Sequence, residues 1–220
     1  MSVIRLWPQP AVTSELNGLY LQADLHALAR PNAPFVYSNF VTSLDGRIAV
    51  AQDGALGVPD GTGNARDWRL FQELAAQADV LLVTGPFMHK LAAGSAEPIA
   101  QFAKPQFADL APWRAAHNLP PLPDLAVVSP SLDFDLAPQA LARGRRVRVV
   151  TTAAAPEARK RALQQQGAEI VVAGDDDVAG DALIDALAAR GYQTIYSPAG
   201  PNILHLLAAA DRLDRPHLTH

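Results

Sequence analysis

At 220 residues, 49% hydrophobic and 18% charged, the chain is long enough to bury a sizeable core, and we expect one domain over residues 1–220. Its net charge of −4, with no basic run longer than Arg159-Lys160-Arg161, argues against nucleic acid as a partner. The absence of cysteine excludes disulfides, thiolate metal sites and cysteine nucleophiles. Since the N-terminus lacks a signal-peptide core and no run reaches about 18 apolar residues, we expect a cytoplasmic protein with no membrane partner.

Two hydrophobic periods alternate along the chain after an amphipathic stretch from Ser14 to Leu28. Strand-like runs occur at Phe35 to Thr42, Val80 to Thr84, Leu125 to Ser129, Val147 to Thr151, Glu169 to Val172 and Thr194 to Tyr196. Helical spacing occurs at Ala65 to Gln77, Pro156 to Gln166, Ala179 to Ala189 and Asn202 to Ala210. This exchange of strand and helix predicts an α/β protein with three α/β/α layers and a mainly parallel central sheet.

The alternation fails between Pro86 and Pro123, where seven of the 18 prolines fall. Proline disfavours the interior of a helix or a central strand, and long irregular segments are usually functional or mobile. We therefore predict a surface insertion or lid beside the sheet, with Trp113 packed against the body and a mobile tip.

The stretch Ser43-Leu44-Asp45-Gly46 comes directly after the first core strand. In open parallel sheets, ligands bind outside the carboxyl ends of the strands, and glycine lets the backbone turn or approach a ligand closely. Asp45 is therefore a candidate site residue. The alternative is that Ser43 and Asp45 only form a turn, as such residues commonly do.

Three further strand ends carry residues suited to binding. The amides after Thr84-Gly85 and the Thr84 hydroxyl could meet an anion or nucleotide, and Ser129 places another hydroxyl at a strand end. In Ser197–Asn202, a turn of small residues with Pro201 near the helix start leaves backbone N–H groups free for a phosphate. The alternatives are an ordinary strand exit, a helix cap and a compact strand-to-helix turn.

Other motifs carry less information. The glycine-rich stretch Gly57 to Gly63 matches neither the P-loop spacing nor the GxGxxG spacing of phosphate-binding loops. It is interpreted as a flexible turn. The six histidines form no HxH or HExxH pair, and the run Asp175-Asp176-Asp177 precedes a helix, where acidic residues suit the N-terminus. We predict no metal site.

Several of these segments together resemble a known family, in the same order and over most of the chain. They are S-L-D-G-R-I-A at Ser43 to Ala49, A-D-V-L-L-V at Ala78 to Val83, V-V-S at Val127 to Ser129, and A-G-P at Ala199 to Pro201 followed by I-L-H-L-L and D-R-L-D-R. They are similar to the reductase domain, the C-terminal part, of the bifunctional riboflavin-biosynthesis deaminase/reductase. The resemblance implies a fold like that of dihydrofolate reductase. It also implies an NADPH-dependent oxidoreductase that reduces the ribose of a phosphoribosylamino-pyrimidine, a small-molecule substrate.

The resemblance also implies roles for individual residues. Asp45 would lie where the nicotinamide meets the substrate, binding sugar hydroxyls or organising a proton-delivering water, with Ser43 beside it on the substrate side. The residues implied to contact NADPH are Ala49, Thr84, Gly85, Ser129, Gly200, Pro201, Asn202 and Ile203.

The chain departs from the family pattern at three positions. Ala75 stands where arginine usually helps hold the substrate phosphate, Phe87 replaces a threonine near the cofactor, and Pro198 replaces a glutamate. Two functions follow: a reductase acting on a substrate other than the phosphorylated pyrimidine, or a non-catalytic nucleotide-binding or structural relative. The chain ends within a strand-like run, Arg215 to His220, where family members continue with antiparallel strands. We expect its unpaired edge to favour a homodimer.

Overall fold

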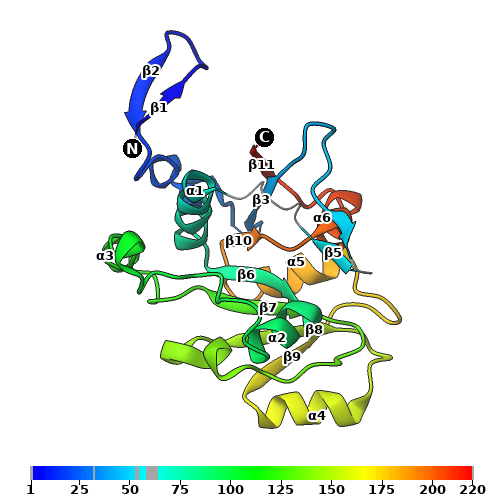
Figure 1. Ribbon diagram of the computed structural model, residues 1–220. Coiled ribbons are helices and arrows are strands. Elements are labelled where there is room, and N and C mark those ends of the chain that lie inside the picture. Colours follow the sequence, from blue (N-terminus) through cyan, green and yellow to red (C-terminus); the bar gives the residue numbers. More distant parts are fainter. Residues whose placement is uncertain (1, 32, 53–54, 58–63, 220) are drawn as a thin grey trace.

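A computed structural model of the chain describes residues 2–31, 33–52, 55–57 and 64–219. Seven strands form one parallel sheet in the order β11-β3-β10-β6-β7-β8-β9 (Figure 1). In chain order they are β3 (Phe35–Val41), β6 (Val80–Thr84), β7 (Asp124–Val128), β8 (Val147–Thr151), β9 (Ala168–Val172), β10 (Thr194–Ser197) and β11 (Arg215–Thr219). The predicted parallel sheet is confirmed.

Helices cover both faces of the sheet. They are α1 (Ala65–Ala76), α2 (Gly85–Ala92), α3 (Leu110–Ala116), α4 (Glu157–Gln165), α5 (Gly180–Ala188) and α6 (Pro201–Ala209). Short 3-10 helices are η1 (Leu21–Ala23), η2 (Leu25–Leu28), η3 (Pro105–Phe107) and η4 (Pro138–Gly144). Two small hairpins complete the described elements, β1 (Ser2–Arg5) with β2 (Val12–Glu15), and β4 (Val50–Gln52) with β5 (Ala55–Gly57). Residues 58–63, the larger part of the turn predicted over Gly57–Gly63, lie outside the described residues.

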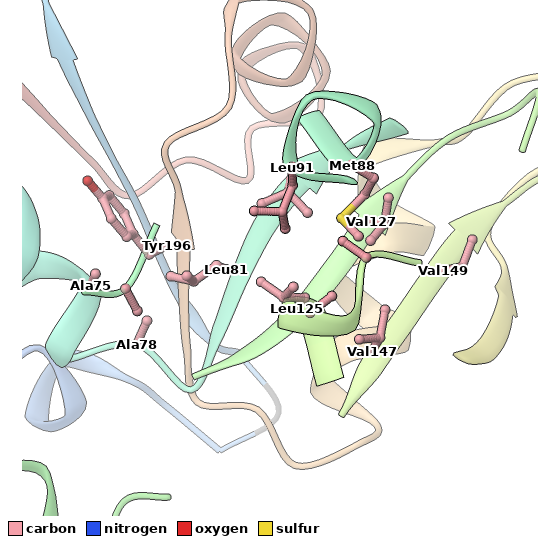
Figure 2. Close-up of a cluster of buried hydrophobic side chains, with 14 of the residues drawn as sticks. Ala75, Ala78, Leu81, Met88, Leu91, Leu125, Val127, Val147, Val149 and Tyr196 are labelled. Atoms are coloured by element: carbon pink, nitrogen blue, oxygen red, sulfur yellow. The ribbon is translucent and has the colours of Figure 1, made fainter. Parts of the chain in front are cut away.

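Two hydrophobic clusters form the core, one on each face of the sheet. The first joins α1 to α4 to the sheet, and Figure 2 shows Met88 and Leu91 of α2 gathered with Leu125 and Val127 of β7. The second joins α5 and α6 to the opposite face. Strands buried on both faces favour apolar residues, and β6 and β7 are apolar except for Thr84 and Asp124 at their ends. The three-layer prediction is therefore confirmed.

The segment Pro86–Pro123 is not the irregular lid that its prolines predict. It contains α2, η3 and α3, because Pro86 and Pro105 lie in the first turn of a helix, where the missing N–H has no intrahelical partner to lose. Phe102, Phe107 and Leu110 of this segment are buried in the core. Trp113 packs against the same cluster, as predicted.

The amphipathic stretch Ser14–Leu28 forms β2, η1 and η2. Two residues with positive φ interrupt it, Gly18 at 84° and Asp24 at 40°. Backbone N–H groups in this region donate to a buried side chain of α1, as Tyr20 N does to Glu73 at 2.9 Å. Figure 1 shows β1 and β2 projecting from the body beyond α1.

Arg114 joins α3 to the junction between α1 and β6. Its fully buried guanidinium donates hydrogen bonds of 2.8 Å to the carbonyls of Ala76 and Ala78, and one of 2.7 Å to Pro120. Burial lowers the pKa of Arg114 to about 10, so the group stays charged at neutral pH.

Replacing Arg114 should therefore destabilise the protein strongly. Arg114→Met keeps much of the volume but leaves three carbonyls without their donor, and we expect the free energy of unfolding to fall by about 3 kcal/mol. Urea denaturation followed by circular dichroism measures the change. The matched control is Arg161→Met on the exposed side of α4, which should change stability by less than about 0.5 kcal/mol. Equal effects of the two variants would contradict this role.

Candidate active site

A cleft of two adjoining chambers lies at the carboxyl edge of the sheet. The α1-side chamber, of about 510 Å³, is lined by residues of α1, the end of β3 and Ile48-Ala49. The α6-side chamber, of about 770 Å³, is lined by the start of α6 and the residues after β7. Both are lined by Thr84, Phe87, Lys90, Gly200 and Pro201. In the sheet, β10 lies between β3 and β6. The chain leaves β6 towards β7 but leaves β10 in the opposite direction, towards β11, and the cleft lies where these two directions diverge.

The turn after β3 is a closed local structure. The Ser43 hydroxyl donates to the Asp45 carboxylate, and Gly46, with φ of 81°, donates its N–H to the Ser43 carbonyl at 2.8 Å. The Asp45 carboxylate also pairs with Arg47 at 3.2 Å and is exposed. The hydrogen bond from Ser43 and the nearby Arg47 lower the pKa of Asp45. Neither Ser43 nor Asp45 lines either chamber; the residues that do so follow directly, at Ile48 and Ala49.

The predicted residues after β6 and β7 form one wall. Thr84 lines both chambers, and its hydroxyl oxygen accepts the Phe87 N–H at 3.4 Å, which caps α2. Gly85 is buried behind that wall and lines neither chamber. A Cβ on Gly85 would lie 3.0 Å from the Ser129 hydroxyl oxygen, so glycine leaves room for Ser129, which lines the α6-side chamber. Gly85 therefore supports the site from behind.

The start of α6 forms the opposite wall. Gly200, Pro201, Asn202 and Ile203 all line the α6-side chamber, as predicted for a cofactor site. Gly200 is the N-cap, its φ is −64°, and a Cβ built there would meet no heavy atom within 4 Å. The backbone conformation therefore does not require glycine, whereas a side chain at this position would extend into the cleft.

Sequence reasoning missed several residues of the cleft that carry polar or aromatic side chains. Asn39, Asp67, Trp68 and Phe71 line the α1-side chamber, and Lys90 lines both chambers. The signal for Trp68 and Phe71 was present as their spacing of three on a predicted helix. No local pattern marks Asp67 or Lys90, because a charged residue facing a cleft has the same sequence context as one facing water.

The three departures from the family pattern occupy different environments. Phe87 and Pro198 line the α1-side chamber and make it more apolar. Ala75 is fully buried in the core, and Figure 2 shows it beside Ala78 in the hydrophobic cluster. Ala75 lines neither chamber.

Within the described residues, no three or more histidine or acidic side chains gather as a metal site would require. None of the described helices combines the length and apolar character needed to cross a bilayer.

Comparison with known proteins assigns most of the chain to one family. Residues 34–220 match the model of the RibD C-terminal domain family. The chain belongs to this family. The match begins just before β3 and includes both chambers, whereas β1 and β2 lie outside it. No curated protein matches the chain.

Solved structures share the fold of this RibD C-terminal domain. A pyrimidine reductase-like protein from Corynebacterium diphtheriae is 21% identical with a TM-score of 0.64, covering 84% of this chain and 73% of its own. The riboflavin biosynthesis reductase of Saccharomyces cerevisiae is 15% identical with a TM-score of 0.56, covering 89% and 78%. RibD of Acinetobacter baumannii is 16% identical with a TM-score of 0.56, covering 85% of this chain but 46% of its own.

The turn at Asp45 offers a direct test of its electrostatics. The Ser43 hydroxyl stabilises the charged carboxylate, so Ser43→Ala should raise the pKa of Asp45 towards its ordinary value. Titration of the Asp45 carboxyl carbon by NMR measures this shift. Asp135, whose pKa is lowered by a hydrogen bond from Gln166, is the internal control and should titrate identically in both proteins. An unchanged Asp45 pKa would show that the hydrogen bond does not persist in solution.

Proposed function

We propose that this protein is an NADPH-dependent reductase resembling the pyrimidine reductase of riboflavin biosynthesis. The observation that carries the proposal is the pair of adjoining chambers at the carboxyl edge of the sheet, with the uncapped start of α6 open to them at Gly200. Family membership supports a reductase of this class. The proposed substrate is a small molecule that occupies the α1-side chamber while the cofactor extends into the α6-side chamber.

The α6-side chamber fits an anionic dinucleotide. The positive end of the α6 dipole faces it, and Gly200 leaves the backbone open to a phosphate. Lys90 is exposed, and its ammonium group has no ion pair within the described part of the chain. The hydroxyls of Ser129 and Ser131 add hydrogen-bonding groups. When bound, NADPH would supply the hydride for the reduction.

The residues of this chain would contribute binding, orientation and exclusion of water. The apolar walls of the α1-side chamber, including Phe71, Phe87 and Pro198, would exclude water from the reacting groups. Thr84 and Lys90, which border both chambers, would contact ligand groups at their junction. Fixing two reactants side by side accounts for much of the rate in such reactions.

Calorimetric titration with NADPH, followed by NADPH oxidation assays on a panel of carbonyl and imine compounds, tests the proposal. Binding with turnover is the expected result. Binding without turnover of any compound favours a non-catalytic nucleotide-binding relative, for which the apolar substitutions Phe87 and Pro198 are the supporting observation. The absence of NADPH binding contradicts the proposal.

Gly200→Val tests the start of α6. The valine side chain would fill the space where backbone meets phosphate, so NADPH affinity should fall at least tenfold, or about 1.4 kcal/mol. The fold should be unaffected, because a Cβ at this position meets no heavy atom within 4 Å. The matched control is Ala208→Val, on an exposed position further along α6, which should bind NADPH normally. Normal affinity in Gly200→Val would remove this turn from the cofactor site.

The catalytic role of Asp45 is a separate proposal. It requires the turn Ser43–Arg47, which adjoins Ile48 at the chamber wall, to place the carboxylate against a bound substrate. Asp45→Asn keeps the shape and removes the charge, so turnover should fall while NADPH affinity changes little. Steady-state kinetics and calorimetry measure the two effects. Full activity would leave Asp45 as a turn residue only.

A further inference from the structure

The α1-side chamber contains a carboxylate that the fold leaves without a cation. Asp67 lines this chamber, only 8% of its surface is exposed, and it forms no ion pair with any residue that the structure describes. Its Oδ1 accepts one hydrogen bond, from the Thr219 hydroxyl at 2.6 Å. A carboxylate removed from water is stable only when its oxygens accept enough hydrogen bonds. The remaining acceptor capacity of Asp67 is therefore available to a ligand.

Flat apolar side chains line the same chamber as this carboxylate. The rings of Trp68 and Phe71 are stacked, with centroids 4.6 Å apart and planes at 17°, and both line the chamber. Phe87 belongs to the same lining. Asn39, 6% exposed, provides an amide that can both donate and accept. These surfaces suit a planar ring whose edge carries hydrogen-bonding groups.

One carboxylate lines each chamber among the described residues, the buried Asp67 in the α1-side chamber and the exposed Asp177 in the α6-side chamber. Lys90 is the only cationic side chain among the described lining residues of the α1-side chamber, and it lies where that chamber meets the α6-side chamber. The start of α6, which favours anions, also belongs to that junction. A phosphate is therefore favoured at the junction, near Lys90 and the start of α6, whereas beside the buried Asp67 it would meet a like charge in a partly dry site.

We propose that Asp67 determines the substrate class of this cleft, by accepting hydrogen bonds from N–H groups of a planar, non-phosphorylated ring bound in the α1-side chamber. The ring lies among Trp68, Phe71 and Phe87, and its amino groups face the carboxylate. This assignment rests on the proposed function, because it treats the α1-side chamber as the substrate end of the cleft. Asp67 binds and selects the substrate and takes no part in the hydride transfer.

The test uses the full chain and two pyrimidine probes, diaminouracil, which carries amino groups, and uridine monophosphate, which carries a phosphate. Calorimetry measures both affinities in the wild type, in Asp67→Asn and in Asp185→Asn. Asp67→Asn keeps an acceptor for the Thr219 hydroxyl, and the control removes an exposed carboxylate on α5. Far-UV circular dichroism and thermal midpoints verify that each variant is folded.

We expect Asp67→Asn to weaken diaminouracil binding at least tenfold, while uridine monophosphate binds equally or more tightly and Asp185→Asn matches the wild type. Wild-type affinity for diaminouracil in Asp67→Asn would overturn the assignment. Equal weakening of both probes, or failure of the wild type to bind diaminouracil, would also overturn it. NADPH titration of the same proteins separates the proposed function from the role of Asp67. If the wild type does not bind NADPH but Asp67→Asn still weakens diaminouracil binding, the proposed cofactor is wrong and the role of Asp67 is retained.

Discussion

The end of α1 is the point on which the arrangement of the cleft depends. The last carbonyls of a helix have no partner within it, and here they are buried, so side chains must satisfy them. The Tyr37 hydroxyl of β3 donates to the Leu74 backbone carbonyl at 2.8 Å, and the Thr194 hydroxyl of β10 donates to the Gln77 backbone carbonyl at 2.9 Å. Arg114 of α3 donates hydrogen bonds to the carbonyls of Ala76 and Ala78 at the same junction. Three elements distant in sequence are thus tied to one helix end.

This junction fixes the orientation of α1 over the sheet. The stack of Tyr37 on Tyr196, with ring centroids 5.0 Å apart, lies beneath the helix, and Phe71 meets the Tyr196 ring at 5.6 Å. At the other end, the Asn64 side chain accepts the N–H groups of Arg66 and Asp67 and fixes where the helix begins. With both ends held, the helix presents its cleft-facing side chains at the carboxyl edge of β3 and β6.

The cleft combines two environments that serve different parts of a ligand pair. One end is bounded by a helix start, hydroxyls and Lys90, which together favour anions. The other end is bounded by aromatic rings and the Asp67 carboxylate, which favour a flat group carrying hydrogen-bond donors. Phe87 and Pro198 contribute to the apolar end, so two of the residues that distinguish this chain from the family pattern line its proposed substrate end.

The sequence by itself determined the layered fold and half of the cleft. Alternating strand and helix periods are local properties, so they located the strands beginning at Phe35 and Val80. The segments that follow two predicted strands drew attention to Ser129 and Gly200, which line the α6-side chamber. Helix α3 and the inward face of α1 depended on contacts between distant residues. A proline run gives no sign that Arg114 will satisfy the end of α1, and an aspartate in a first helical turn gives no sign that it faces a cleft. Only the tertiary structure decided these, because burial and hydrogen-bond satisfaction are set by which elements meet.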